Sequence, residues 1–506
     1  MNTSTQKTQF TTSLEKEVKK LKTALCSKDI LVYNFESKDN IKCALIYADG
    51  MVNKQVLGEL IVRPLSLSFL KNSGDFAEND GGRVAFYEKI VLDVTQFPEV
   101  KKAKDFDDAC FQVLDGNTLL LIDGSPAPFV LGAKLLPVRA ISEPPTDVAI
   151  KGPREGFIED IKVNMTLVRK RLKTPNLILE NLTVGKQSGS NVCVCFLKGT
   201  ANQKLVDELL EKIQAINVDV LPDSSYLSAL IAPRKHSVFK QLGTTEKPDV
   251  FCAKLAEGRV GVLLDGSPIA LTAPYLLIED FQASEDYFIS PVSASILRFI
   301  RITAFILALL LPGAYTATQL FKMQILPLGL MLTVSGGVQG IPFSPSMEVF
   351  LILLVFEILK EASVRMPKYV GMSLSIVGAL VLGEAAVSAG FVSTPSIIIV
   401  ALSGICLYTV PNMVETGSIL RWIALIVGGS LGFFGLVLFI TFLLYYLVSS
   451  DCFFTPLLAP FAPFDLHDMK DSGVKFSIRE LKTRPHAFLS NNKTRLKLKE
   501  NENDGD

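Results

Sequence analysis

The feature that most constrains this chain is a long segment with very few charges. Residues 291–450 hold 12 charged residues in 160 positions, whereas the other 346 positions hold the remaining 90. Such a segment is typical of membrane-spanning helices, because each span needs about 20 mostly apolar residues. The mean hydropathy of +0.35 is also high for a wholly soluble protein. We therefore expect a soluble part joined to a membrane part.

The composition excludes several classes of function. Basic and acidic residues both number 51, so no basic surface for nucleic acid is expected. The eight cysteines form no CxxC pair and the N-terminus has no apolar signal-peptide core, so we expect a cytosolic, reduced soluble part. Three histidines (His236, His467 and His486) offer little for a metal site. With no Walker loop and no GxGxxG, no enzyme and no cofactor is predicted.

The soluble part contains an internal repeat. Asp107–Pro126 (DDACFQVLDGNTLLLIDGSP) aligns with Asp249–Pro268 (DVFCAKLAEGRVGVLLDGSP) at an offset of 142 residues. Upstream, Cys43–Leu60 aligns with Val192–Leu209 at an offset of 149. Because the order is the same and the offsets differ by seven residues, we expect two copies of one α/β module.

Each copy is expected to run through the same elements. An alternating apolar run predicts a strand (41–47; 192–197), which a glycine turn connects to a helix. A second helix (104–114; 249–257), a strand (118–122; 259–264), the DGSP turn and a return strand are expected to follow.

The repeated DGSP turn has two interpretations. It is a hairpin connection, in which glycine supplies a positive φ and proline fixes the next φ. Alternatively, Asp123, Ser125, Asp265 and Ser267 bind a ligand or form contacts between the modules.

A helix is predicted between the modules, at Lys151–Lys173. Acidic residues near its start and basic residues at its end suit the helix dipole. Its apolar stripe consists of Phe157, Ile161, Met165, Val168 and Leu172. The stripe packs between the modules, or it docks to a membrane surface or a partner subunit.

The membrane part is expected to hold four to six helical segments. Candidates are 293–316, 347–364, 370–389, 395–411 and 422–448, with 324–340 as a weaker piece. Basic residues near the first candidate and after the second predict that the soluble part is cytoplasmic. Five spans place the tail outside, although its basic residues favour the inside. One short piece, 324–340 or 395–411, is therefore expected to be re-entrant, which hints at a pore or cavity.

Charges inside apolar segments are the sharpest chemical signal. Glu348, Glu357 and Glu361 lie on one predicted helix with Lys360, and Glu384 lies in the next. Such residues are costly in lipid and often mark a functional path. Glu357, Lys360 and Glu361 are expected to form one patch, which is either part of an ion path or a boundary ion pair. Glu384 is either a buried structural contact or a part of the same path.

Several stretches together resemble the A subunit of GerA-type spore germinant receptors. They are KGPREGFIED, NMTLVRKRLKTPN, VLLDGSPIAL, ALLLPGAY, GIPFSPSMEVFLILLVFEILKEASVRMPK, SIVGALVLGEAAVSAGFVS, VPN and LAPFAPFDLHDMKD, between about residues 150 and 471. The resemblance implies a complex with a transporter-like B subunit and a lipoprotein C subunit in the spore inner membrane. It also implies a response to nutrients, bound directly or through the B subunit, and homo-oligomers around an ion path.

Three classes of function remain after this resemblance. The first is a non-enzymatic receptor and channel subunit in which a ring of Glu348 and Glu357 favours cations. The others are a structural scaffold of the receptor and a secondary transporter or lipid translocator.

The expected domains follow from these features. They are an N-terminal extension (1–28), a cytoplasmic α/β module (29–150), a linker helix (151–175), a second such module (176–288), a helical membrane domain (289–450) and a cytoplasmic, partly disordered tail (451–506).

Overall fold

The computed structural model describes residues 10, 12–68, 87, 89, 91–95, 97, 99–135, 151–367 and 383–495. The chain divides into two compact units. The α/β unit contains Met1–Tyr275, Cys452–Thr455 and Ile478–Asp506, and the helical unit contains Leu276–Asp451 and Pro456–Ser477. The expected tail domain is therefore divided between the two units, and the helical unit begins earlier than the expected boundary at 289.

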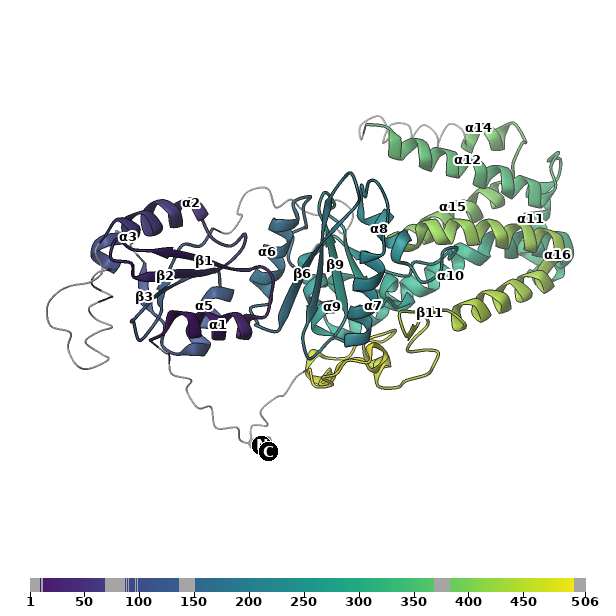
Figure 1. Ribbon diagram of the computed structural model, residues 1–506. Coiled ribbons are helices and arrows are strands. Elements are labelled where there is room, and N and C mark those ends of the chain that lie inside the picture. Colours follow the sequence, from purple (N-terminus) through teal and green to yellow (C-terminus); the bar gives the residue numbers. More distant parts are fainter. Residues whose placement is uncertain are drawn as a thin grey trace. The chain divides into compact units, whose positions relative to one another are not determined.

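An antiparallel five-stranded sheet forms the first module of the α/β unit (Figure 1), in the order β1-β2-β4-β5-β3. Its strands are β1 (Ile30–Glu36), β2 (Lys42–Ala48), β3 (Val100–Lys102), β4 (Thr118–Ile122) and β5 (Phe129–Leu131). Its helices are α1 (Leu14–Leu25), α2 (Lys54–Leu57), the π-helical turn η1 (Gly58–Val62), α3 (Arg63–Leu67) and α5 (Phe106–Leu114).

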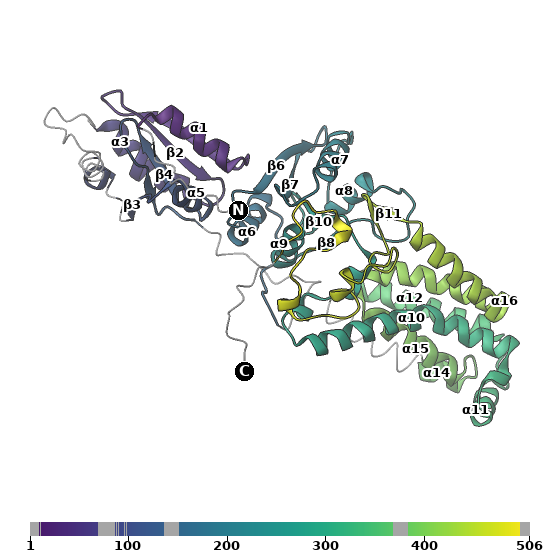
Figure 2. The same ribbon diagram turned by 90° about the horizontal axis from the view of Figure 1, so that it is seen from below.

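Helices cover both faces of this sheet (Figure 2). On one face, α1 and α5 pack against Ala44 and Ile46 of β2. On the other face, α2, η1 and α3 pack against Cys43 and Leu45. Successive side chains of a strand point to opposite faces, so a strand between two helical layers must be apolar at nearly every position. All five residues of β4 are accordingly buried.

The second module repeats this architecture, with the strand order β6-β7-β9-β10-β8. Its strands are β6 (Leu177–Val184), β7 (Ser190–Leu197), β8 (Gly243–Thr245), β9 (Val260–Leu264) and β10 (Ala270–Ala273). Its helices are α6 (Ile161–Arg171), α7 (Gln203–Gln214), α8 (Ser224–Ile231) and α9 (Pro248–Ala256). The two strand orders match position for position, which confirms the predicted pair of α/β modules.

The helix expected as a linker belongs instead to the second module. It begins only after Asp160, whose side chain accepts a hydrogen bond from the backbone of Lys162 at 2.8 Å. Four of its five predicted stripe residues, from Phe157 to Val168, are buried against the second sheet, and Leu172 packs beside them. Its counterpart in the first module is α1, so the expected N-terminal extension also contributes to a core.

A buried ion pair joins the two modules. Arg169 of α6 and Asp29, which precedes β1, are 1% and 4% exposed. Arg169 Nη2 lies 2.7 Å from Asp29 Oδ1, and Arg169 also donates to Ser27 Oγ and to the carbonyl of Leu177. Ser27 Oγ in turn accepts a bond from the backbone nitrogen of Leu179 at the start of β6.

The helical unit contains six α-helices among the described residues: α10 (Pro291–Phe321), α11 (Leu328–Val338), α12 (Pro345–Arg365), α14 (Gly383–Ser388), α15 (Thr394–Tyr408) and α16 (Val414–Val448). Short 3-10 turns are η2 (Leu277–Phe281), η3 (Ser284–Tyr287), η4 (Met323–Ile325), η6 (Pro411–Met413) and η7 (Asp468–Lys470). The short strands β11 (Asp451–Cys452) and β12 (Thr455–Pro456) lie at the boundary between the two units along the chain, and the 3-10 turns η8 (Ile478–Glu480) and η9 (His486–Phe488) belong to the α/β unit.

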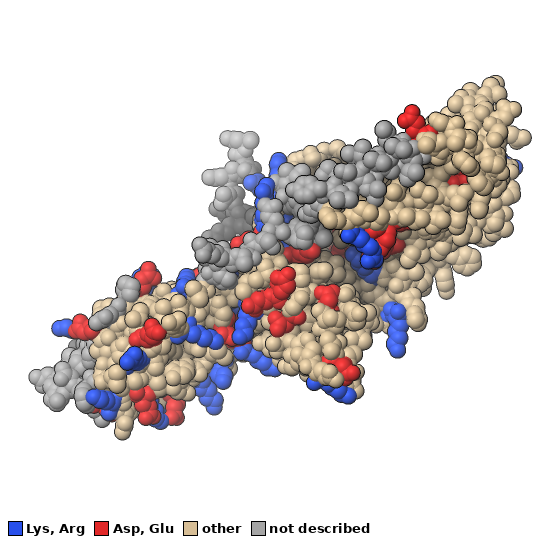
Figure 3. Space-filling model, turned by 90° about the horizontal axis from the view of Figure 1, so that it is seen from above, with Lys and Arg blue, Asp and Glu red and all other residues tan. Residues whose placement is uncertain are grey.

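Two helical stretches in the described part are long and apolar enough to cross a membrane, Pro291–Phe321 and Pro411–Val448. The face shown in Figure 3 has few charged side chains over the helical unit. The expected larger number of spans is not confirmed by length and composition. α12 is also long, but it carries five charged residues, and much of the candidate 370–389 lies outside the described residues.

The contacts of α10 fix the directions of its neighbours. We call the end where α10 begins proximal and the end where it finishes distal. α15 runs opposite to α10, because Ser396 contacts Tyr315 whereas Ser403 contacts Ala308. The first half of α16 runs parallel to α10, because Gly417 lies beside Phe305 and Gly432 beside Phe321.

The second half of α16 turns back at Gly432. This residue has φ 64° and ψ −149°, a conformation that is essentially restricted to glycine. A Cβ placed on Gly435 would lie 2.9 Å from the carbonyl oxygen of Val427, eight residues earlier. Eight residues of straight helix span about 12 Å, so the chain must reverse here. Figure 1 shows the ribbon of α16 folding back on itself.

The segment after α16 returns to the proximal end of the unit. We call residues 456–477 the C-terminal strap. The carbonyl of Leu457 accepts a hydrogen bond from the backbone of Leu277 at 3.0 Å. Further along, Asp471 contacts Arg298 in the second turn of α10. The strap and the beginning of α10 therefore lie at the same end.

Candidate functional site

A half-buried cluster of charged side chains surrounds Glu357 near the middle of the helical unit. Its Oε1 atom lies 2.7 Å from Arg421 Nη2 and accepts a 3.1 Å hydrogen bond from Ser418. Lys360, one turn further along α12, pairs with the other carboxylate oxygen. Arg421 is fully buried and also donates to Ser403 Oγ of α15. The cluster thus joins α12, α15 and α16.

The carboxylate of Glu357 is paired with basic groups of the same chain. One carboxylate faces two basic groups, Arg421 and Lys360, so the three side chains together carry one positive charge. A buried arginine requires a partner, because an isolated charge is very costly in an apolar environment. Within a single chain, Glu357 therefore compensates Arg421.

Glu361 and Glu384 lie apart from this cluster. Glu361 pairs with Arg365 at 2.6 Å, and their side chains are 61% and 77% exposed. The expected patch of Glu357, Lys360 and Glu361 is therefore wrong in its third member, because Glu361 finds its partner one turn further along α12. Glu384 is exposed on α14, next to residues that the structure does not describe.

Glu348 is fully buried at the distal end of the helical unit. Its Oε1 atom accepts hydrogen bonds from the backbone nitrogen and, at 2.6 Å, from the hydroxyl of Ser393, the N-cap of α15. Glu348 itself stands in the first turn of α12. Each helix N-terminus carries about half a positive charge, so the carboxylate lies where two such charges meet. This arrangement holds a carboxylate in an apolar unit without an ion-pair partner among the described residues.

A chain of hydroxyl groups extends from Glu348 across two further helices. Ser393 Oγ lies 2.9 Å from Ser396 Oγ, which lies 3.2 Å from the hydroxyl of Tyr315 on α10. Gln319 donates to the same Tyr315 hydroxyl at 2.6 Å. Glu348 thus ends a polar network that crosses the distal part of the helical unit, whereas Glu357 belongs to a separate cluster.

The two DGSP turns serve the same local purpose in both modules. Asp123 Oδ1 accepts a 3.1 Å hydrogen bond from the backbone of Leu14, at the start of α1. Asp265 Oδ1 accepts the equivalent 3.3 Å bond from Ile161, at the start of α6. An aspartate at a helix N-terminus satisfies backbone N–H groups that have no partner within the helix. Each aspartate therefore fixes the first helix of its own module.

The two serines of these turns differ. Ser125 donates within its turn to the carbonyl of Ala127 at 2.9 Å. Ser267 donates to Asp223 Oδ1, the N-cap of α8, at 2.5 Å. Burial alone would raise the pKa of Asp223, but hydrogen bonds from Ser225, Ser267 and the helix backbone lower this pKa to about 2. Asp223 is therefore a strongly held, ionised cap at neutral pH.

The space around the turns bears on whether they hold a ligand. The first turn adjoins a cavity of about 10 Å³, which has room for one water molecule at most. The second turn borders an open depression lined in part by Glu159, Lys162, Asn191 and Asp265. A ligand role for Asp123, Ser125, Asp265 or Ser267 stays a prediction from the sequence.

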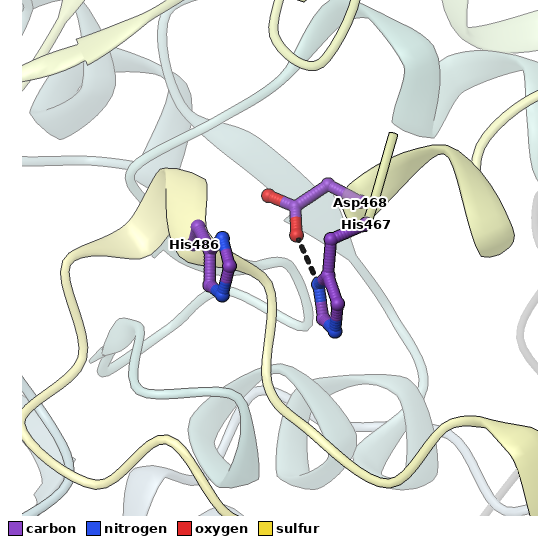
Figure 4. Close-up of side chains that lie close together, drawn as sticks. All are labelled: His467, Asp468 and His486. Carbon is purple, nitrogen blue, oxygen red and sulfur yellow. Dashed lines mark hydrogen bonds and ion pairs between the residues drawn. The ribbon is translucent and has the colours of Figure 1, made fainter. Parts of the chain in front are cut away.

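A histidine lies beside a carboxylate in the C-terminal strap. His467 Nδ1 is 3.1 Å from Asp468 Oδ1 (Figure 4). One histidine and one carboxylate are too few ligands for a structural metal site. His486, also drawn in Figure 4, belongs to the α/β unit. We assign no metal site to the helical unit on this pair.

Several members of the buried ion pairs are not among the residues predicted from the sequence. They are Arg421, the partner of Glu357, and the paired residues Asp29, Asp286 and Arg298. A usable signal was present, because a basic residue at the edge of an apolar segment needs an acidic partner in the same unit. Which acid it would choose depends on helix packing.

Comparisons with known proteins were made over the whole chain. The sequence matches the family model described as "Bacillus/Clostridium GerA spore germination protein" over residues 14–487. It is 31% identical to Spore germination protein KA of Bacillus subtilis (strain 168) over 473 residues, 93% of this chain and 85% of that protein. It is 34% identical to Spore germination protein GerQA of Bacillus cereus over 465 residues, 85% of this chain and 93% of that protein.

Two further matches add context. The uncharacterized membrane protein YfkQ of Bacillus subtilis (strain 168) is 32% identical over 469 residues, 92% of this chain and 89% of that protein. A solved structure, the N-terminal domain of the A subunit of the Bacillus megaterium spore germinant receptor GerK3, covers 53% of this chain and 98% of that domain. Its TM-score is 0.41 at 24% identity.

Proposed function

The chain belongs to the GerA family of Bacillus and Clostridium spore germination proteins, and from this premise we propose that it is the A subunit of a nutrient germinant receptor. The match over residues 14–487 carries this proposal, because it includes both the α/β unit and the helical unit. We place the subunit in the spore inner membrane with an integral B subunit and a lipoprotein C subunit. The nutrient binds this chain directly or through the B subunit.

Deletion of the gene tests the receptor role. Spores that lack this chain should lose the response to one set of nutrients, and a copy of the gene should restore it. Germination in response to the nutrients that the deletion does not affect serves as the control for intact spores. A normal response of the deletion strain to every nutrient of the parent would contradict the proposal.

For the mechanism, we propose that several copies form an ion path and that α12 lies beside it. The polar residues of α12 support this proposal, because Glu348 and the Glu357 cluster lie on one helix nine positions apart. A ring of Glu357 side chains from several copies would not be purely acidic, because Arg421 of the same chain already balances the charge of each Glu357. Opening of the path then requires rearrangement of the ion pair.

The variant Glu357→Gln tests this mechanism. It leaves Arg421 buried with a neutral partner, so we expect altered cation release soon after nutrient addition at a normal protein level. Glu361→Gln is the matched control, because Glu361 is on the same helix and largely exposed. Equal cation release in parent, control and variant would contradict a role of this cluster in the path.

A structural scaffold is the second candidate, and one observation favours it. The buried Glu348 and the half-buried Glu357 of α12 are both engaged inside a single chain, Glu348 by Ser393 and Glu357 by Arg421. Flux recordings on the purified chain in liposomes, alone and with B and C subunits, separate the two candidates. Nutrient-evoked cation flux supports the channel, and silence of every combination with confirmed insertion supports the scaffold.

A further inference from the structure

The first turns of α10 bind the C-terminal strap through a fully buried arginine. Arg298 is 0% exposed, and its Nη1 atom donates to the carbonyls of Asp471 and Ser472 at 2.8 and 2.9 Å. Its Nη2 atom lies 3.2 Å from Asp471 Oδ1. On the other side, its Nε atom lies 3.1 Å from Asp286 Oδ2. One guanidinium thus holds both the strap and the turn η3.

Asp286 is the second centre of this network. It is also 0% exposed, and it forms a two-point ion pair with Arg301, at 2.9 and 3.0 Å. Its backbone carbonyl accepts a hydrogen bond from Lys475 of the strap. The ammonium of Lys475 lies 4.4 Å from the ring centre of Tyr287, whose hydroxyl donates to Asp471 at 3.1 Å.

Main-chain contacts reinforce these ion pairs. The backbone nitrogen of Lys475 donates to Ser295 Oγ at 2.9 Å, and Ser295 Oγ lies 3.4 Å from the carbonyl of Lys475. Gln282 also donates to the carbonyl of Asp471 at 2.6 Å. The strap residues 471–475 are therefore held along the beginning of α10 by both side chains and backbone.

The strap connects the first and the last helix of the unit. Seven residues (449–455) separate it from the end of α16 in the chain, and it is bonded to the beginning of α10 and to η2. Movement of the beginning of α10 away from the strap must therefore break the bonds of Arg298. Because a buried ion pair that loses one partner is strongly destabilised, this detachment needs a compensating change elsewhere.

Basic and acidic side chains lie close together in this network. Arg298 and Arg301 pair with Asp286, Arg298 also pairs with Asp471, and Lys475 donates to the carbonyl of Asp286. Burial lowers the pKa of Lys475, the neighbouring Asp471 raises it and Arg298 lowers it, and the net direction is downward.

We propose that the C-terminal strap is a lock on the beginning of α10, and that the strap must detach from Arg298 when the receptor responds. This inference rests on the receptor function proposed above. The lock keeps the beginning of α10 bonded to the strap in the resting state. Release of Asp471 from Arg298 frees the beginning of α10 to move.

A reversible crosslink tests the lock directly. In spores whose only copy of this chain carries Ser295→Cys and Lys475→Cys, oxidation should join the two cysteines, because Ser295 Oγ already lies 2.9 Å from the Lys475 backbone. Mass spectrometry of the extracted chain measures the crosslink. We expect the crosslinked spores not to respond to nutrient and to recover after reduction. Spores with either single variant, oxidised in the same way, should respond.

Two results would overturn the lock. One is a normal nutrient response of spores in which the crosslink is complete. The other is an unchanged response of Arg298→Gln spores at normal protein level, since this variant removes the charge that holds Asp471 and should lower the nutrient concentration required. The Arg298→Gln result also decides the case if the double cysteine variant does not accumulate.

The same strains distinguish the lock from the receptor role. If the parent chain itself does not restore the response of deletion spores, the proposed function fails. If the parent restores it and the crosslink has no effect, only the lock fails.

Discussion

At the scale of single residues, four buried charged side chains have a compensation that the structure identifies. Arg169 has Asp29, Arg421 has Glu357, and Arg298 has Asp286 and Asp471. Glu348 has two helix N-termini in place of a basic residue. Removal of one partner of a buried ion pair destabilises the fold by more than the intact pair stabilises it.

The joint between the α/β modules is one such pair. Asp29→Asn leaves Arg169 buried without a counter-charge, so we expect the free energy of unfolding of the α/β unit to fall by about 3 kcal/mol. The measurement is the urea concentration at which the buried cysteines of this unit react with a thiol reagent, followed by mass spectrometry on the full chain.

Lys28→Gln is the matched control for the joint. Lys28 pairs with Glu180 across the same joint, but its side chain is 59% exposed. We expect a loss below about 1 kcal/mol, because solvent screens exposed pairs. Equal losses for Asp29→Asn and Lys28→Gln would contradict the assigned role of the buried pair.

The cap formed by Asp223 and Ser267 predicts a pH dependence. The folded-state pKa of about 2 lies below the unfolded value of about 3.9, so the stabilisation is present above the unfolded pKa and is lost as the pH falls toward 2. Ser267→Ala removes one donor to this carboxylate. We expect a loss of about 1 to 2 kcal/mol at neutral pH that shrinks as Asp223 becomes protonated.

The equivalent serine of the first module provides the control. Ser125 donates to a neutral carbonyl, so the effect of Ser125→Ala should not change over the acid range in which Asp223 titrates. Urea unfolding at a series of pH values, followed by circular dichroism, measures both variants. A pH-independent loss for Ser267→Ala would show that the charge on Asp223 is not involved.

At the scale of elements, the reversal within α16 is the least expected feature. A glycine-rich apolar run (GGSLGFFG, 428–435) is compatible with a straight helix as well as with a hairpin. In the structure the run forms a hairpin. The first half of α16 packs closely against α10 through glycines. A Cβ on Gly428 would lie only 2.5 Å from the carbonyl oxygen of Gly313.

Gly432→Ala tests this reversal. Alanine is strained at φ 64° and ψ −149°, so we expect a destabilisation of about 1 to 3 kcal/mol, together with loss of the nutrient response. Gly336→Ala in α11 is the control, because a Cβ there meets no atom within 4 Å and alanine favours a helix. Thermal unfolding of the full chain in detergent measures both. Unchanged stability of Gly432→Ala would contradict the hairpin.

At the scale of the whole molecule, the reversal at Gly432 bears on the question of parity that the sequence left open. One re-entrant piece, 324–340 or 395–411, was expected to restore the tail to the inside. The reversal at Gly432 offers another solution, since it adds one change of direction within the segment treated as one span. The strap then returns to the end where α10 begins.

Labelling of single cysteines tests this arrangement in the membrane. Val474 of the strap is 52% exposed and Val292 at the start of α10 is 71% exposed, whereas Gln339 is exposed near the distal end. We expect a membrane-impermeant maleimide to label Val474→Cys and Val292→Cys from the same side and Gln339→Cys from the opposite side. Labelling of Val474→Cys and Val292→Cys from opposite sides would contradict the arrangement.

The sequence by itself determined the parts that depend on neighbours along the chain. The repeat around DGSP predicted two α/β modules with strands such as 118–122, and the charge-poor segment predicted the apolar helices. These features depend on local patterns, in which turn residues and the alternation of apolar side chains act over a few positions. Motifs in a fixed order also indicated the GerA family, which the match over 14–487 confirms.

Only the tertiary structure decided which charges meet. Glu357 and Arg421 are 64 positions apart, Asp29 and Arg169 are 140 apart, and Arg298 and Asp471 are 173 apart. No local pattern selects Arg421 over Arg365 as the partner of Glu357. The choice follows from helix packing, because desolvation makes a buried charge depend on whichever opposite charge or helix end the fold brings within hydrogen-bond distance.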